Sequence, residues 1–438
     1  MMFVGIDFGT TNSAVSLIGD DGSAKIVSMP PASDNAGADM PRADTLRSIL
    51  AFSPEHRDKA RRLIPRVGQE AVDAYLFGDG DCRLLQSFKS YLTSRLFTSA
   101  SIFNTPYSLE AMIALVVGRL RKAAEAEGGA SVSRVVAGRP VRFVADDGQT
   151  EDDFALARLR QAFATAGIAD VAFEYEPIAA AYYYERGLGH DETVLVADFG
   201  GGTSDFCLVR LGPERSKLAS PQDAIIGTSG VGNAGDALDR RIVEMGIAPF
   251  FGKDVTYRSA GKDLPVPSWI FGKFARWHHI DFLDTQSTRR MLRDIQRHAD
   301  HPELIDQLLA LIEHNLGYLL YRAVEQVKRD LSAKEETTFV FNHHPISITR
   351  TIRRAEFESW ITPELTEIEG CVEGLLQSTG LPATKVDRVF MTGGSSLVPA
   401  VRRIFTRRFG ADRVSSGGEF VSVANGLAYR ARELFSDR

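Results

Sequence analysis

The chain has 438 residues, of which 44% are hydrophobic and 25% charged, so it has the composition of a globular protein and enough length for two or more packed cores. This excludes disordered, collagen-like and coiled-coil proteins. The 51 Lys and Arg against 57 Asp and Glu give a net charge of −6. Binding to a nucleic-acid backbone requires a basic excess, so we expect no nucleic-acid partner.

The sequence also lacks the signals of membrane and secreted proteins. Its longest apolar stretch, residues 111–117, is far shorter than the roughly 20 residues that a membrane helix needs. Asp7 interrupts the N-terminus where a signal peptide would be apolar. The cysteines are scattered and form no CxxC pair, which disfavours a disulfide framework or a zinc site. We therefore expect a cytoplasmic protein with no membrane partner.

The chain opens with the pattern of a β-hairpin. Over residues 2–18, an apolar run leads through a Gly/Thr turn into a second apolar run. The same pattern recurs over residues 194–209, at an offset that places Asp198 on Asp7 and Gly200 on Gly9. One copy at such long spacing indicates an internal duplication with two similar lobes, not a stack of short repeats.

Each hairpin precedes alternating helix and strand patterns. Helical spacing of apolar residues predicts helices over residues 109–125, 153–166, 234–245, 304–332 and 399–409. Short β-branched runs predict strands over residues 133–137, 171–175 and 386–391. Strands that alternate with helices indicate an α/β fold.

We divide the chain into lobe I, residues 1–193, and lobe II, residues 194–438, whose C-terminal helix can return to lobe I. Two less regular segments are interpreted as insertions, residues 30–66 in lobe I and the aromatic-rich residues 248–290 in lobe II. The aromatic residues of the second insertion either pack it or form a partner surface; they include Trp269, Phe271, Phe274 and Trp277.

The two hairpin turns are candidates for a phosphate clamp. Glycine lets backbone N–H groups approach an anion closely, and threonine hydroxyls add donors. Asp7 and Asp198 hold the same place in the two copies. Such a pair suits Mg²⁺, which takes few carboxylates, several waters and phosphate oxygens. The alternative is that each Asp only caps its own turn.

Residues 5–13 and 198–205 resemble the two phosphate loops of the heat shock protein 70 (DnaK) family within the actin-like ATPase superfamily. The resemblance continues in order through residues 86–90 and through the Glu-Pro-x-Ala-Ala-Ala string at 176–181, and it spans nearly the whole chain. It implies a two-lobed α/β fold of duplicated ribonuclease H-like halves, with a nucleotide cleft between the lobes.

The resemblance also implies ATP or ADP with Mg²⁺ as cofactors, and ATP hydrolysis as the activity. Asp7 and Asp198 would hold the metal. The phosphates would contact Gly9, Thr10, Thr11, Asn12, Gly200, Gly201, Gly202 and Thr203. The implied catalytic residues are Lys89, Glu176, Asp198, Thr203 and Asp205. Pro140 and Arg160 lie where the family has a proline and an arginine that report the nucleotide state.

Later motifs resemble the nucleoside side of the family's site: a Gly-rich helix start at residue 235, a helix at 325–332 and a Gly-Gly-Ser turn at 393–395. The implied contacts are Gly235, Glu325, Lys328, Arg329, Ser332, Gly393, Gly394 and Ser395. Residues three, four and seven apart share one helical face, which here is either a nucleoside contact or a solvated charged face. Leu397 replaces an arginine that stacks on adenine in the family, so only Arg329 remains of that pair.

The chain stops where a full chaperone continues into a peptide-binding domain, so we expect a truncated member similar to the YegD-like proteins. A protein client, a co-chaperone or an exchange factor would be its partner. Two alternatives stay open: a small-molecule kinase of the same superfamily, and an actin-like protein that binds nucleotide and forms filaments.

Overall fold

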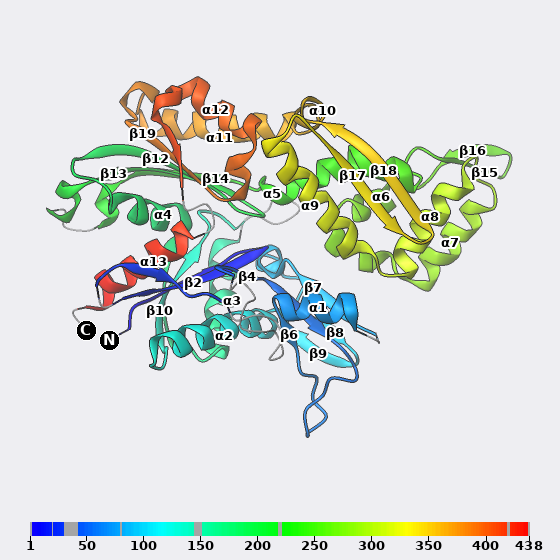
Figure 1. The fold of residues 1–438 in the computed structure, drawn as a ribbon, viewed down its shortest axis with the longest axis horizontal. Coiled ribbons are helices and arrows are strands. Elements are labelled where there is room, and N and C mark those ends of the chain that lie inside the picture. The colour runs from blue at the N-terminus through cyan, green and yellow to red at the C-terminus, as the bar shows by residue number, and fades with distance from the viewer. Residues whose placement is uncertain are drawn as a thin grey trace. The chain divides into compact units, whose positions relative to one another are not determined.

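The computed structural model describes residues 2–19, 21–29, 43–78, 81–143, 151–217, 221–417 and 421–436 (Figure 1). These residues form two compact units. Unit 1 holds Met1–Ala234, Ile368–Ser396 and Arg402–Arg438, and unit 2 holds Gly235–Glu367 and Leu397–Val401. Residues 30–42 of the first expected insertion lie outside the described residues. The lobe boundary after residue 193 stays a prediction.

The first sheet of unit 1 is built on the N-terminal hairpin. Strand β1 (Val4–Phe8) pairs antiparallel with β2 (Asn12–Ile18) and parallel with β10 (Arg134–Arg139). Strand β3 (Ala24–Ile26) extends the sheet beside β2, and β11 (Asp170–Tyr175) extends it beside β10. The strand order is therefore β11-β10-β1-β2-β3.

The second sheet of unit 1 repeats this plan. Strand β12 (Glu192–Phe199) pairs antiparallel with β13 (Ser204–Leu211) and parallel with β19 (Arg388–Thr392). Strand β14 (Ile225–Val231) lies beside β13, and β20 (Val414–Ser416) lies beside β19. Read from its other end, the order β20-β19-β12-β13-β14 corresponds to β11-β10-β1-β2-β3 in the first sheet, which has one further strand, β4 (Leu46–Arg47), beside β2.

The registers of the two hairpins also agree. Phe8 lies opposite Ser13 in the first, and Phe199 lies opposite Ser204 in the second. Equal strand order and equal register are what a duplicated unit would keep. The structure thereby confirms the predicted α/β fold and its two similar halves.

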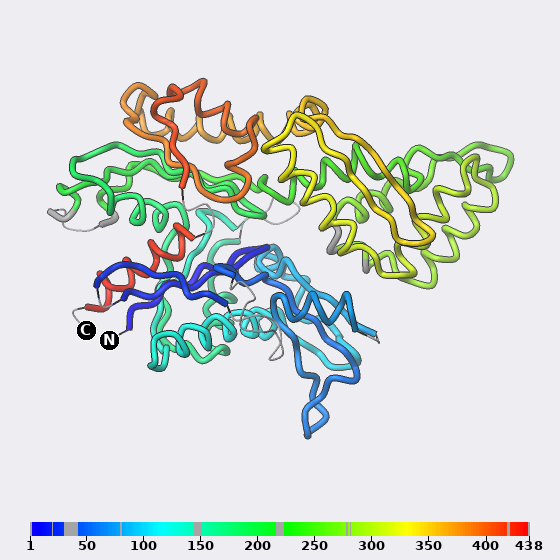
Figure 2. The backbone as a smooth tube through the Cα atoms, in the orientation of Figure 1, coloured from blue at the N-terminus to red at the C-terminus, as the bar shows by residue number. Residues whose placement is uncertain are grey.

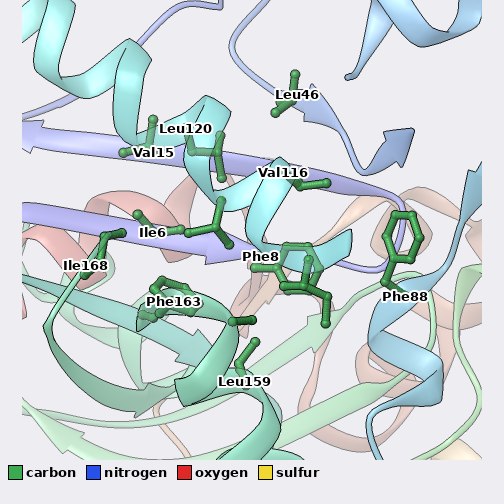
Figure 3. Close-up of a cluster of buried hydrophobic side chains, with 14 of the residues drawn as sticks. Ile6, Phe8, Val15, Leu46, Phe88, Val116, Leu120, Leu159, Phe163 and Ile168 are labelled. Atoms are coloured by element: carbon green, nitrogen blue, oxygen red, sulfur yellow. The ribbon is translucent and has the colours of Figure 1, made fainter. Parts of the chain in front are cut away.

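Helices α2 (Leu109–Gly128) and α3 (Asp152–Thr165) pack on one face of the first sheet. Ser108 caps α2 by accepting a hydrogen bond from the Ala111 N–H at 3.1 Å, and Gly129 ends the helix with a φ of 66°. Figure 3 shows the resulting core, whose labelled residues are Ile6, Phe8, Val15, Leu46, Phe88, Val116, Leu120, Leu159, Phe163 and Ile168. The i, i+4 pairs of the helices face the alternating residues of the strands.

Helices α4 (Glu176–Glu185) and α13 (Ser422–Phe435) occupy the space between the two sheets (Figures 1 and 2). Helix α13 contacts β1, β2 and β10, whereas α4 contacts β12 and β13. Helix α13 lies close to both β1 and α4. A Cβ at Gly5 on β1 would lie 2.3 Å from the Ala428 nitrogen, and one at Gly426 on α13 would lie 1.7 Å from the Ala179 carbonyl oxygen. Small residues at these contacts therefore let the two halves share one core.

Helices α11 (Thr362–Thr379) and α12 (Pro399–Phe409) supply residues to the other face of the second sheet. The Phe405 ring lies 5.9 Å from the Phe199 ring, edge to face. A Cβ at Gly227 would lie 3.1 Å from Leu375 Cδ1. The predicted bounds of α12 are confirmed.

Residues 43–108 of unit 1 add a small three-stranded sheet. It pairs β5 (Ile49–Phe52) with β6 (Arg66–Val67) and β7 (Arg83–Gln86), and it packs against helix α1 (Gln69–Phe77). The short 3₁₀ helix η1 (Phe88–Tyr91) follows β7. The same part of the chain also holds strand β4 (Leu46–Arg47), before this sheet, and strands β8 (Ser99–Ile102) and β9 (Thr105–Ser108), after η1.

Unit 2 is mainly helical. Its helices are α5 (Gly235–Arg241), α6 (Ser268–Phe274), α7 (Gln286–Gln296), α8 (Pro302–Glu313), α9 (Gly317–Ala333) and α10 (Arg354–Trp360). Its hairpins are β15 (Thr256–Ser259) with β16 (Lys262–Pro265), and β17 (Glu336–His343) with β18 (Ile346–Arg353). No helix in the described part of the chain is long and apolar enough to cross a bilayer.

Two predicted helices of unit 2 differ from expectation. The single helix predicted over 304–332 is wrong, because α8 and α9 are separated at Asn315, which adopts the left-handed φ of 54° that asparagine tolerates. The helix predicted over 234–245 is α-helical only to Arg241 and continues as a π-helix over Ile242–Ile247. Arg350 donates to the Gly246 carbonyl at 2.5 Å, so this carbonyl of the π-helix has a side-chain hydrogen-bond donor.

The aromatic residues of the second expected insertion divide between core and surface. Phe271 and Phe274 are buried, and the Phe274 ring lies 5.0 Å from that of Phe251. Trp269 is 45% exposed, with the Lys273 ammonium over its ring. The side chain of Trp277 lies outside the described residues. Phe271 and Phe274 are thus packed in the interior, as the interpretation of these aromatic residues as packing residues predicts.

Candidate functional site

The first hairpin turn, at the end of β1, is fixed by two serines. A Cβ at Gly9 would lie 2.1 Å from the Asn12 carbonyl oxygen, so the turn requires glycine. The Gly9 N–H donates to Ser13 Oγ at 3.2 Å, and Ser48 Oγ donates to the Gly9 carbonyl at 2.8 Å. The two serine hydroxyls hydrogen-bond to each other at 2.8 Å. Sequence reasoning missed this role of Ser48, which no motif marks.

The second turn, at the end of β12, is held in a related way. The Gly200 N–H donates to the Thr203 carbonyl at 2.9 Å, and Ser204 Oγ donates to the Asn233 carbonyl at 2.5 Å. Gly393, with a φ of 81°, lies against this turn, because a Cβ there would be 2.0 Å from the Phe199 carbonyl oxygen. The predicted Gly-Gly-Ser turn therefore borders the second hairpin.

The two hairpin turns lie next to each other within unit 1. A Cβ built on Gly202 would be 3.4 Å from Thr10 Oγ1. Thr10 itself is buried, although its side chain is polar. The glycine turn of one half thus lies beside a threonine hydroxyl of the other, a proximity that a phosphate clamp built from both turns requires.

A buried ion pair lies in the same unit. Lys89, on η1, donates from Nζ to Glu176 Oε1 at 2.5 Å, and the two side chains are only 10% and 9% exposed. Glu176 is the first residue of α4, directly after strand β11. Gly138 on β10 leaves room for it, because a Cβ there would lie 3.1 Å from Glu176 Cγ. The structure therefore brings together two residues predicted as catalytic.

Asp205 connects the two halves. Its Oδ2 accepts a hydrogen bond from Thr203 Oγ1 at 2.6 Å, and its Oδ1 accepts one from the Val141 N–H at 2.8 Å. Val141 follows the end of β10, whereas Asp205 lies on β13. The Val141 contact was not foreseen; its one sequence signal is that it follows Pro140.

Burial and mutual repulsion raise the pKa values of the aspartates. Burial raises the pKa of Asp7 to about 7, and the negative charge of Glu176 adds to this effect. The pKa of Asp205 rises to about 7 for the same two reasons. Asp198 has a pKa well above its ordinary value because of burial and because Glu176, Asp7 and Asp205 repel its charge.

Lys89 is the cation that offsets these carboxylates. Burial lowers its pKa, but Glu176, Asp7 and Asp205 together hold that pKa above its ordinary value. Within the part of the chain that the structure describes, one ammonium group acts on four acidic side chains, so the cluster is short of positive charge: Asp7, Glu176, Asp198 and Asp205.

The donor set fits a hydrated divalent cation. Among the described residues, no three His, Cys, Asp or Glu side chains are grouped so as to hold a metal by themselves. Mg²⁺ retains several waters and binds phosphate oxygens, so it needs only one or two carboxylates from the protein. A cation beside Asp7 and Asp198 would also relieve the repulsion that raises their pKa values.

The residues predicted on the nucleoside side divide between the units. Gly393, Gly394 and Ser395 belong to unit 1, whereas Gly235, Glu325, Lys328, Arg329 and Ser332 belong to unit 2. Their contacts to a nucleoside stay predictions.

Lys328, on α9, is anchored within unit 2. Its Nζ donates to Asp239 Oδ2 at 2.6 Å and to the Gly235 carbonyl at 3.1 Å. Burial raises the pKa of Asp239 to about 7, although Lys328 lowers it. Ser332 Oγ donates to the Lys328 carbonyl at 3.0 Å, whereas Arg329 is exposed. The structure thus joins the predicted residues Gly235 and Lys328, and it adds Asp239, four residues after Gly235, which sequence reasoning missed.

Pro140 and Arg160 occupy different settings in unit 1. Pro140 follows β10, and its carbonyl accepts a hydrogen bond from Arg139 Nε at 3.1 Å. Arg160 is exposed on α3, and its guanidinium lies over the Phe173 ring at 5.3 Å. Their role in reporting the nucleotide state stays a prediction.

Comparison with known proteins supports the reading of these motifs. Residues 313–435 match the family model described as Hsp70 protein. The chaperone protein DnaK of Thermotoga neapolitana is 25% identical over 98% of this chain and 59% of its own length. The DnaK of Thermosipho melanesiensis is 26% identical over 98% and 59%, and that of Thermus thermophilus is 24% identical over 99% and 61%. The chain therefore spans about three fifths of the length of these curated relatives.

The similarity covers nearly the whole chain, and it coincides with the duplicated sheets and the paired hairpin turns described above. The chain is therefore similar to Hsp70 proteins, in the family model over residues 313–435 and in the DnaK relatives over nearly its whole length.

Proposed function

We propose that this chain binds ATP with Mg²⁺ and hydrolyses it, as an ATPase of the DnaK chaperone type. The observation that carries the proposal is one buried cluster beside two matched glycine turns: a single lysine, Lys89, with the acidic residues Asp7, Glu176, Asp198 and Asp205. A cluster short of positive charge, next to clustered N–H donors, suits a metal-bound triphosphate. The relatives named DnaK support the same reading.

The two turns would bind the phosphates. In this proposal the backbone N–H groups of residues 10–12 and 201–203, with the hydroxyls of Thr10 and Thr11, donate to phosphate oxygens. The Gly9 and Gly200 N–H groups instead hold the shape of their own turns. Asp7 and Asp198 hold the hydrated Mg²⁺, whose charge offsets that of the β- and γ-phosphates when it is bound. The 3.4 Å distance from a Gly202 Cβ position to Thr10 Oγ1 supports joint action of the two turns.

Lys89 would position the γ-phosphate and the attacking water. Water attacks the γ-phosphorus as the bond to the ADP oxygen breaks, and most of the catalysis comes from positioning and charge neutralisation. Glu176 holds the Lys89 ammonium at 2.5 Å, so the amine is already ordered. Asp205, fixed by Thr203 and Val141, would orient the water or the metal shell.

Nucleotide would also favour one arrangement of the two predicted lobes. ATP that contacts both hairpin turns stabilises whichever state holds them together, since a ligand shifts an equilibrium by its differential affinity. A client protein, a co-chaperone or an exchange factor would respond to that change. That any of these three kinds of protein is the partner follows only if the chain acts as a DnaK-type chaperone.

The test is phosphate release from ATP with and without Mg²⁺. We expect Mg²⁺-dependent release by the wild type and a loss of release in Asp198→Asn, which keeps the size of the side chain but removes its charge. Asp153→Asn, at an exposed position on α3, is the matched control and should behave as the wild type. No phosphate release, together with no calorimetric heat on mixing with ATP or ADP, would overturn the proposal.

The same samples separate the two alternatives. A small-molecule kinase would consume ATP only when a hydroxyl acceptor is added, whereas an ATPase needs none. An actin-like filament protein would sediment in the presence of ATP. Nucleotide binding with sedimentation but no phosphate release would favour the filament reading.

A further inference from the structure

Arg158, on helix α3, is a buried arginine that contacts the segment following Lys89. Only 7% of the residue is exposed. Its Nη1 donates to the carbonyls of Tyr91 at 3.2 Å and Ser94 at 3.0 Å, and its Nη2 donates to that of Phe97 at 3.0 Å. Its Nε donates to Glu110 Oε1 on α2 at 2.5 Å. One guanidinium therefore ties residues 91–97 to two helices of the core.

The contacted segment continues directly from the turn that carries Lys89. That turn, Phe88–Tyr91, starts after Ser87, which is buried and has a left-handed φ of 60°. A residue other than glycine keeps this conformation only where its surroundings hold it. Phe88 and Leu92 anchor the two flanks in the core, and Arg158 holds the last residue of the turn through the Tyr91 carbonyl.

A second arginine reaches the same segment from the surface. Arg95 pairs with Glu151 at 2.5 Å, and its guanidinium lies over the Phe154 ring at 4.5 Å. The Arg95 side chain is 64% exposed, and exposed pairs contribute little. The buried contacts of Arg158 are thus the stronger restraint on residues 91–97.

We infer that Arg158 is a positioning residue for Lys89. By fixing residues 91–97 it holds the η1 turn where the Lys89 ammonium reaches Glu176. The catalytic consequence rests on the proposed function, whereas the effect on the position of Lys89 does not. The role requires arginine, because a planar fork with five N–H donors can serve three carbonyls and one carboxylate at once. Lysine can retain the pair with Glu110 but cannot span the carbonyls.

The first test compares Arg158→Lys with Glu110→Gln in the full chain. Arg158→Lys should lower kcat for ATP by about tenfold or more with little change in KM, since a small displacement of a catalytic group can cost ~100-fold. Glu110→Gln disturbs the same buried cluster but leaves the carbonyl contacts of Arg158. It should lower the melting temperature while keeping kcat within about twofold of the wild type. If kcat falls equally in both variants, or in neither, the inference is wrong.

The second test needs no ATPase activity. Without nucleotide, an amine-reactive succinimidyl ester should modify Lys89 slowly, because this amine is buried and paired. Modification of the Lys89 peptide, read by mass spectrometry against the exposed Lys59, should accelerate several-fold in Arg158→Lys but not in Glu110→Gln. Unchanged labelling in Arg158→Lys would overturn the inference. A wild type that labels as expected but releases no phosphate would instead refute the proposed function alone.

Discussion

The N–H of Val141 donates to Oδ1 of Asp205 at 2.8 Å, and this bond joins the end of a strand in the first sheet to the hairpin of the second. It spans two halves that are far apart in the sequence. Because Asp205 also accepts from Thr203 Oγ1, both of its carboxylate oxygens are occupied. A residue of the proposed catalytic cluster thus also links the duplicated halves.

Asp205→Asn should separate these two roles. The amide oxygen can still accept from Val141, and loss of one negative charge relieves repulsion in a buried acidic cluster. We expect an unchanged or higher melting temperature and phosphate release reduced ~100-fold, the scale of losing a general acid or base. Asp205→Ala, which leaves the buried Val141 N–H without its acceptor, should cost about 1–3 kcal/mol in the free energy of unfolding. Equal destabilisation by both variants would contradict this division.

Removing Lys89 should leave Glu176 as an uncompensated buried charge. Lys89→Met should therefore lower the free energy of unfolding by about 3–5 kcal/mol, and the double variant Lys89→Met/Glu176→Gln should recover most of it. Denaturant unfolding measures both. The single variant should also slow single-turnover hydrolysis more than it weakens ATP binding. An unchanged single-turnover rate would remove Lys89 from the proposed mechanism.

Stability should depend on pH through the aspartates of the cluster. The pKa values of Asp7 and Asp205 are about 7 in the folded chain, above the unfolded value near 3.8. Between these pH values the folded state retains protons that the unfolded state has lost, so their contribution to stability falls as pH rises from about 4 to about 7. The melting temperature of the wild type relative to Asp205→Asn should therefore fall over this range.

Added Mg²⁺ gives the control for this pH effect. A cation held by Asp7 and Asp198 favours their charged forms, so it should stabilise the wild type more at pH 8 than at pH 5. The same Mg²⁺ addition should have a smaller effect on Asp198→Asn. A pH-independent difference between wild type and Asp205→Asn would show that the carboxyl of Asp205 is not raised in pKa.

The parts predicted from sequence are those with local signals. Both hairpins show alternating apolar residues around a glycine turn, and the structure has them in the expected register. The bounds of α12 follow from Pro399 at its start and Gly410 after its end, which are ordinary helix signals. The break between α8 and α9 also had a signal, since Asn315 suits a left-handed position, but continuous apolar periodicity outweighed it.

The parts that were missed depend on contacts between distant segments. Ser48 supports Gly9 from a strand that no motif marks, and the Val141 N–H is a backbone group that every residue but proline has. In the sequence, Arg158 has no feature that distinguishes it from the other charged residues of an amphipathic helix, and its role becomes apparent only from the carbonyls that it contacts. Such roles arise from the tertiary structure, so a single sequence cannot distinguish these residues from their neighbours.

Gly393 should be intolerant of any side chain. Its φ is 81°, and a Cβ would lie 2.0 Å from the Phe199 carbonyl oxygen at the second hairpin turn. Gly393→Ala should lower the free energy of unfolding by more than about 1 kcal/mol and weaken nucleotide binding. Gly118 lies within α2 with open space around it, so Gly118→Ala should instead stabilise by about 0.5–1 kcal/mol. Thermal melting and ADP titration of both variants check the contrast.

The pair of Lys328 and Asp239 tests whether helix α9 serves the nucleoside or only the fold. The 2.6 Å pair is largely buried, so Lys328→Met alone should cost about 3–5 kcal/mol by leaving the Asp239 charge uncompensated. Lys328→Met/Asp239→Leu replaces both charges with apolar groups and should restore most of that stability. If Lys328 contacts the nucleoside, ADP affinity measured by calorimetry stays low in this stable double variant. Recovery of affinity together with stability would assign Lys328 to the fold alone.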